Sequence, residues 1–136
     1  MTSNWADRLP DVHNVHRTLG ISMDECTPER VVLSLEVGPD THQYFGVLHG
    51  GVSALLAEGA ASIGAVISVG DDEVAVGTDL NCSHLRPVTS GRIRAIATPI
   101  RKGRSVHVWG IELYDDADRL ISVARCTLQV IKRPTN

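Results

Sequence analysis

The residues best suited to chemistry lie close together, between positions 43 and 62. A polar loop holds Gln43 and His49, Gly50 follows, and Glu58 and Ser62 then lie in a stretch that is otherwise apolar or small. Glu58 is the only charged side chain of that stretch. An isolated carboxylate can serve as a general base or as a nucleophile. Glycine at the start of a helix leaves backbone N–H groups bare, so a carbonyl oxygen or an anion could dock there.

Hydrophobic spacing predicts a helix that carries Glu58. At about 100° per residue, one side of this helix holds an apolar stripe that we expect to pack on the core. Glu58 lies about 120° from the centre of the stripe, beside Ser62. Two interior glycines cost the helix about 1 kcal/mol each relative to alanine, which indicates close packing on a sheet. The stripe consists of Val52, Leu55, Leu56, Gly59, Ile63, Val66 and Ile67.

Both polar residues also have an ordinary structural interpretation. Glu58 could be a solvated carboxylate on an amphipathic helix. His49 could be a hydrogen-bonding histidine without a catalytic role. The residue pattern by itself leaves these interpretations open beside the chemical ones.

The composition is that of an ordinary soluble domain and narrows the functional classes. At 136 residues, with 43% apolar and 21% charged residues, the chain suits one domain, 1–136, around a single core. A net charge of −3 argues against nucleic-acid binding. No signal-peptide pattern is present. The central helix looks too short and too rich in glycine to span a bilayer, so we expect no membrane partner.

Cysteine usage indicates the cytoplasm. Cys26, Cys82 and Cys126 are far apart and lack the spacing of metal ligands. Their odd number argues against a disulfide framework, and a reducing compartment is the simplest setting. We therefore expect a cytoplasmic protein without a bound metal.

The elements around the central helix predict an α+β domain. One long helix beside antiparallel strands is the arrangement that defines this class. A helix is expected over 4–19, the alternation over 31–37 predicts a half-buried strand, and the tail 132–136 should fray. Apolar content on both sides of the last strands suggests that a partner subunit covers part of the sheet. The predicted strands are 21–25, 31–37, 73–86, 92–100, 105–114 and 120–131.

The motifs around the central helix resemble those of the hotdog-fold acyl-CoA thioesterases. The resemblance covers about residues 20–131 and is greatest to the glutamate-using branch, which includes 4-hydroxybenzoyl-CoA thioesterases and thioesterases of the phenylacetate type. In the phenylacetate type the carboxylate is usually aspartate, whereas this chain has Glu58. The matching segments are Gln43, the run 45–51 (FGVLHGG), Glu58, 79–81 (DLN), 84–87 (HLRP), the glycine-containing basic turn and 109–112 (WGIE).

The resemblance implies a hotdog fold, in which a curved antiparallel sheet wraps a long central helix, and chains that pair into homodimers and often homotetramers. It implies that Glu58 is the catalytic carboxylate and that the Gly50 amide polarises the thioester carbonyl. Gln43 and His49 would position the thioester or the Gly50 loop. Ser62 would hold the attacking water or the substrate. No cofactor is implied, because coenzyme A is part of the substrate.

The resemblance also assigns a role to the basic turn. Arg101, Lys102, Gly103, Arg104 and Ser105 would meet the nucleotide end of coenzyme A, whose phosphates a local cationic patch can attract. The same turn could equally be a solvated hairpin.

Two aromatic residues precede the glycines. Tyr44 and Phe45 are expected to pack within the protein, and a place in the acyl pocket is the alternative.

Helix geometry adds a constraint on the proposed pair of Gly50 and Glu58. Eight residues of helix span about 12 Å, which is farther than a carboxylate side chain reaches. One chain therefore cannot easily bring its own Gly50 amide and its own Glu58 to one carbonyl. Two antiparallel central helices of a dimer can, with the donor from one subunit and the carboxylate from the other.

Other functions remain open at this point. A hotdog hydratase or dehydratase would need a catalytic histidine in a different arrangement, and a non-catalytic acyl-CoA-binding sensor would ordinarily bring a DNA-binding segment. The sequence does not choose between a general-base route and a mixed anhydride. It also leaves aryl, hydroxylated aryl and medium-chain acyl groups open.

Overall fold

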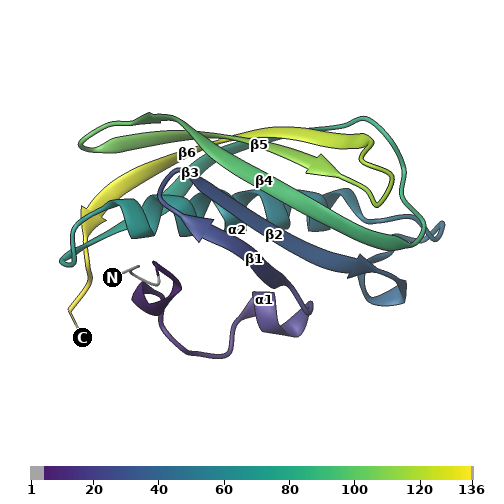
Figure 1. Ribbon diagram of the computed structural model, residues 1–136, viewed down its shortest axis with the longest axis horizontal. Helices are drawn as coiled ribbons and strands as arrows, with labels where there is room; N and C mark the ends of the chain where they lie inside the picture. The colour runs from purple at the N-terminus through teal and green to yellow at the C-terminus, as the bar shows by residue number, and fades with distance from the viewer. Residues whose placement is uncertain (1–4, 136) are drawn as a thin grey trace.

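A six-stranded sheet lies against one long helix in the computed structural model, which describes residues 5–135 (Figure 1). The strand order is β1-β2-β4-β5-β6-β3, and every neighbouring pair is antiparallel. The helix and the antiparallel strands confirm the predicted α+β class and the arrangement of a hotdog fold. The strands are β1 Ser22–Thr27, β2 Arg30–Val37, β3 Glu73–His84, β4 Gly91–Lys102, β5 Val106–Tyr114 and β6 Leu120–Lys132, and the helices are η1 Trp5–Arg8, α1 Val15–Thr18, η2 Pro39–Thr41 and α2 Gly50–Ser68.

The central helix α2 packs on the sheet mainly through small residues. Gly64 sits on the indole ring of Trp109 from β5, which is fully buried. Small side chains let the helix backbone approach the strands closely, which offsets the cost of glycine in a helix. The buried residues of α2 are Ser53, Leu56, Ala57, Ala60, Ala61, Ile63, Gly64, Ala65 and Ile67.

This packing corrects the predicted apolar stripe. Leu56, Ile63 and Ile67 are buried as expected, but Leu55 and Val66 are only partly buried and line a cavity. The sheet therefore meets a face of alanine and glycine, and the larger aliphatic residues stand on the flanks of the helix.

Strand β2 is more buried than a half-buried strand should be. Val32 and Ser34 alternate with the fully buried Val31 and Leu33 and would therefore lie on the outer face of a half-buried strand, yet they are only 7% and 2% exposed. Arg92 on neighbouring β4 covers this face, since its Nε donates to Ser34 Oγ at 3.1 Å and its guanidinium reaches Ser22 Oγ at 2.8 Å.

The N-terminal segment is not the continuous helix predicted over 4–19. It forms η1 and the four-residue α1, and residue 4 lies outside the described residues. Pro10 interrupts the segment because it lacks an N–H and disfavours helix at the residue before it. Arg8 ties the segment to the end of α2, donating to the carbonyls of Ile67 and Val69 at 2.7 and 2.8 Å.

The C-terminal tail begins later than the predicted 132–136. Lys132 is the last residue of β6, and the Arg133 N–H donates to the Asp72 carbonyl at 2.7 Å. Residue 136 lies outside the described residues.

Length and composition alone would let α2 cross a bilayer. It has 19 residues with a mean hydropathy of 1.5, so the prediction that it is too short is wrong. Its buried face is packed on the sheet of this domain, which is the setting of a core helix.

The contact of Gly64 with Trp109 should be sensitive to any added side chain. A Cβ at Gly64 would lie 2.6 Å from Trp109 Cζ3 and 3.0 Å from Cζ2, and the buried ring has little room to move. We expect Gly64→Val to lower the free energy of unfolding by about 2 kcal/mol or more. Urea unfolding at a fixed protein concentration measures this change. Gly38→Val is the matched control, since nothing lies within 4 Å of a Cβ at Gly38. Equal unfolding midpoints for both variants would contradict the packing.

Candidate active site

The start of α2 leaves one backbone donor free. His49 is the N-cap residue, and its Nδ1 accepts a hydrogen bond from the Gly51 N–H at 2.8 Å. The Gly50 N–H has no acceptor within residues 5–135. It therefore stands at the positive end of the helix dipole and can bind an oxygen that carries negative charge.

His84 lies directly over Gly50. It is the last residue of β3, and a Cβ on Gly50 would lie 2.7 Å from His84 Nε2. Its Nδ1 is 3.1 Å from the hydroxyl oxygen of Ser122, a buried residue of β6. When Ser122 donates to Nδ1, the ring proton resides on Nε2, and His84 becomes a second donor beside the Gly50 N–H.

Gln43 adds a third polar group to the same place. Its Oε1 accepts a hydrogen bond from the Phe45 N–H, which leaves its NH₂ group free to donate. Gln43, Gly50 and His84 line one cavity of about 320 Å³. Sequence reasoning assigned Gln43 and Gly50 to the site but gave His84 no role.

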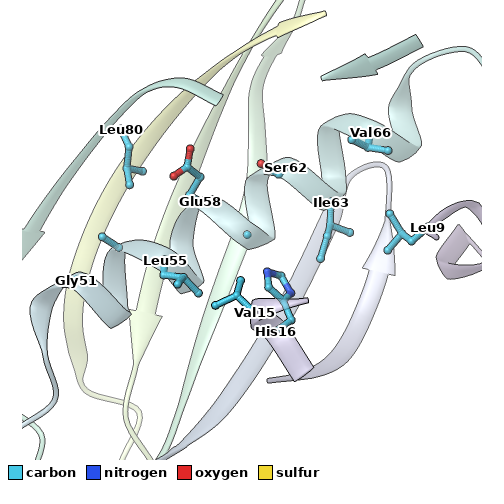
Figure 2. Close-up of a pocket in the computed structure, with 12 residues that line it drawn as sticks. Leu9, Val15, His16, Gly51, Leu55, Glu58, Ser62, Ile63, Val66 and Leu80 are labelled. Carbon is cyan, nitrogen blue, oxygen red and sulfur yellow. The ribbon is translucent and has the colours of Figure 1, made fainter. Parts of the chain in front are cut away.

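Glu58 lies in a second cavity, of about 580 Å³, together with Gly51 and Ser62 (Figure 2). Its carboxylate reaches β3 at Gly77, where a Cβ would collide with Glu58 Oε2. Gly77 is also the point at which the pairing of β3 with β6 shifts register. No hydrogen bond or ion pair of the Glu58 side chain occurs in the described part of the chain, so the carboxylate is free to act on a ligand.

The thiol of Cys126, which the negative charge of Glu58 influences, is a poor nucleophile. Burial, with smaller contributions from the negative charges of Glu58 and Asp79, raises the pKa of Cys126 to about 11. The Cys126 side chain is fully buried and stays protonated at neutral pH.

The structure separates the donor groups from the carboxylate within one chain. Gln43, Gly50 and His84 line one cavity, and Glu58 and Ser62 line the other. This division agrees with the length of about 12 Å that eight residues of helix span.

The remaining predicted site residues line neither cavity. Tyr44 and Phe45 are fully or almost fully exposed, at 103% and 89%, so the packing expected for them within the chain is wrong.

The basic turn 101–105 joins β4 to β5 near the end of α2, whereas Gly50 lies at the other end (Figure 1). Lys102 Nζ donates to the Pro28 carbonyl at 3.1 Å and to Glu29 at 3.3 Å.

No metal centre is evident in residues 5–135, which contain no group of three histidine, cysteine, aspartate or glutamate side chains placed to hold an ion. The candidate groups described above are therefore a backbone N–H, an imidazole, an amide and a carboxylate.

Comparison with known proteins places this geometry in a family. The sequence model of the thioesterase superfamily matches residues 45–122. A 1,4-dihydroxy-2-naphthoyl-CoA hydrolase from Listeria monocytogenes serotype 1/2a (strain 10403S) is 41% identical over 119 residues, which cover 88% of this chain and 97% of that protein.

Solved structures agree with the sequence comparison. A thioesterase from Haemophilus influenzae has a TM-score of 0.84 at 40% identity, over 87% of this chain and 82% of that one. A thioesterase from Staphylococcus aureus, solved with one glutamine replaced by alanine, has a TM-score of 0.84 at 33% identity, over 88% of this chain and 98% of that one. The same protein was also solved with one glutamate replaced by alanine. These matches, which extend over most of the chain, show that the protein belongs to the thioesterase superfamily.

Proposed function

We propose that this protein hydrolyses acyl-CoA thioesters at a site shared by two copies of the chain. The observation that carries the proposal is the division of the site. An unoccupied donor pair, Gly50 and His84, lies in one cavity, and an unpaired carboxylate, Glu58, lies in another. When two copies of α2 pair antiparallel and overlap over their first halves, the start of one lies beside the middle of the other, so a second copy supplies what each cavity lacks.

The chemistry follows from these groups. The thioester oxygen accepts hydrogen bonds from the Gly50 N–H and from His84 Nε2, and both donors stabilise the negative charge that develops during attack. Gln43 supports the carbonyl through its NH₂ group. Glu58 of the other copy takes the proton of a water that attacks the carbonyl carbon, and Ser62, one helical turn further on, holds that water or the substrate.

The remaining bonds change as the tetrahedral intermediate collapses. The C–S bond breaks, the acid leaves, and the coenzyme A thiolate takes up a proton. A direct attack by Glu58 on the carbonyl carbon would give a mixed anhydride that water then hydrolyses, and the same groups serve that route.

The surface of the single chain supports pairing. Strand β3 has β6 as its neighbour on one side only, so within residues 5–135 its other edge has no strand beside it. An unpaired strand edge is a ready site for a second chain. We propose a homodimer formed there, which can assemble further into a homotetramer.

Pairing would also bring the basic turn to the substrate. Within one chain, turn 101–105 lies near the end of α2 and far from Gly50 (Figure 1). In the pairing proposed above, the end of each helix extends past the start of the other, so the basic turn of one copy lies on the side of the other copy's Gly50. Arg101 and Arg104 have no ion pair within the described chain and are free to meet the phosphates of coenzyme A.

Similar proteins support the proposed substrate class and the proposed roles of Gln43 and Glu58. The Listeria protein is named as the hydrolase of an aryl-CoA thioester, and we extend the CoA thioester class to this chain. The glutamine and the glutamate replaced in the Staphylococcus protein are separated by fifteen positions, the same separation as that of Gln43 and Glu58 here. The free thiols of Cys26, Cys82 and Cys126 fit a cytoplasmic enzyme.

Removing the base should abolish turnover and leave the fold intact. Glu58→Gln keeps the shape of the side chain, and we expect kcat to fall by at least about 10²-fold, the range of a general base. Release of free thiol from acyl-CoA measures the rate, and circular dichroism checks folding. Near-normal activity of a folded Glu58→Gln protein would contradict the assignment.

Replacing the second donor tests His84. His84→Phe keeps a flat ring beside Gly50 but removes Nε2, and we expect kcat to fall about 10²-fold because the oxyanion loses a donor. KM should change little when the lost bond forms mainly in the transition state. His42→Phe is the control, since His42 binds the Thr89 carbonyl and lines neither cavity. Equal rates for both variants would remove His84 from the site.

A site shared by two chains predicts complementation between two inactive variants. One carries Glu58→Ala, and the other carries Gly50→Pro, which deletes the donor N–H. In a mixed dimer one site combines an intact Gly50 with an intact Glu58, so about half of the wild-type activity per heterodimer should return. Each parent is first shown to be folded, dimeric and inactive. If purified heterodimers stay inactive, donor and carboxylate meet within one chain and the shared site is wrong.

A further inference from the structure

We propose that His16 is a specificity-determining residue that hydrogen-bonds a polar group at the end of the acyl moiety farthest from the thioester. The inference rests on the proposed hydrolysis at Glu58. It selects acyl groups that carry a distal hydroxyl or carbonyl, among which hydroxylated aryl groups fit best.

The first argument is the composition of the cavity wall. The cavity beside Glu58 extends along α2 to Ser62 and Ile63, and Leu9, Val15 and His16 of the N-terminal segment line its border. The lining is mostly aliphatic or glycine. Away from Glu58 and Ser62, His16 is its only polar side chain. A mostly apolar cavity with few placed polar groups is typical of a site that orients a small ligand.

The second argument is the position of the ring. The imidazole of His16 lies on Gly59, the residue after Glu58, where a Cβ would be 2.7 Å from Nε2 and 2.8 Å from Cε1. In Figure 2 the ring points at α2, on the other side of the helix from the Glu58 carboxylate. Glu58 and His16 nevertheless line the same cavity, so an acyl group that starts at the carboxylate and curves around α2 within this cavity reaches the ring.

The third argument is that the ring nitrogens have no protein partner. Within residues 5–135 the hydrogen bonds of His16 are those of its backbone: its N–H donates to Asn14 Oδ1 at 2.9 Å, and its carbonyl accepts from the Ile21 N–H at 2.8 Å. Burial lowers the pKa of His16, so the ring is neutral at neutral pH and offers one donor and one acceptor. A polar group in an apolar wall loses free energy when a ligand displaces its water, unless the ligand replaces the hydrogen bond.

The fourth argument concerns what lies behind the ring. A further cavity of about 740 Å³ beneath the N-terminal segment shares Leu9, Val15, His16 and Ile63 with the Glu58 cavity. Side chains thus form the partition between the two spaces. A long alkyl chain could pass them and leave the ring unpaired, whereas a hydroxylated aryl group would stop at the ring and pair with it.

The test compares the full-length protein with His16→Phe and His16→Gln on three substrates: benzoyl-CoA, 4-hydroxybenzoyl-CoA and octanoyl-CoA. Phenylalanine keeps the packing on Gly59 and removes both nitrogens, and glutamine restores a hydrogen-bonding group. We expect the wild type to favour 4-hydroxybenzoyl-CoA in kcat/KM. His16→Phe should reduce its preference over benzoyl-CoA by about three- to tenfold, and His16→Gln should keep most of it.

The control is His13→Phe, which changes an exposed histidine of the same segment that lines neither cavity. It should leave the ratio of the two aryl substrates unchanged.

The outcomes separate the two proposals. An active wild type whose ratio survives His16→Phe, or in which His16→Phe slows both aryl substrates equally, overturns the role of His16 alone. A wild-type preference for octanoyl-CoA over both aryl thioesters overturns it as well. A folded wild type that releases no thiol from any of the three substrates counts against the proposed hydrolysis, and the role of His16 falls with it.

Discussion

The structure depends on side chains that lie directly against the backbone of glycine residues. Trp109 packs on Gly64, His84 on Gly50 and Glu58 on Gly77. At each place a Cβ would come closer than real Cβ contacts allow. The first contact sets how closely the central helix approaches the sheet, and the other two fix an imidazole at the start of the helix and a carboxylate at β3. The same property of glycine, the absence of Cβ, thus serves the packing of the helix and makes room for two side chains of the proposed site.

This packing gives the faces of α2 different surroundings. Alanine and glycine residues face the sheet, so the helix lies close to the strands, and its larger aliphatic residues lie on the flanks. Leu55 and Val66 then line the cavity beside Glu58 instead of filling the core. Glu58 is half-buried and has no ion pair within residues 5–135, which leaves its carboxylate available to a bound ligand.

The sequence was sufficient for the features that depend on local spacing. The spacing of Gly50 and Glu58 predicted that the two lie apart within one chain, and the apolar segments between turns predicted the six strands, with boundaries that moved by one or two residues. Hydrophobic periodicity shows which residues avoid water but not which surface they meet, and this explains the error over Leu55 and Val66. The prediction of a continuous N-terminal helix was wrong because Pro10 interrupts the helix despite the apolar spacing around it.

Local spacing could not predict contacts between residues that are far apart in the sequence. His84 stands 34 positions after Gly50 in the sequence, and only the pairing of β3 with β6 brings it over the start of α2 and beside Ser122. His16 reaches Gly59 because Arg8 fastens the N-terminal segment to the end of the helix. Nothing in the local pattern around either histidine signals these contacts.

The glycine contacts also explain why the two halves of the site are held apart so firmly. His84 and Glu58 are each seated on backbone, on Gly50 and Gly77, which rotamer changes alone cannot bring together over about 12 Å of helix. Closing that distance within one chain would require α2 to leave the sheet, and the packing of Gly64 on a fully buried Trp109 opposes this. The close packing that stabilises the single domain therefore keeps Gly50 and Glu58 apart within one chain, and this is the reason that we propose a site shared with a second copy.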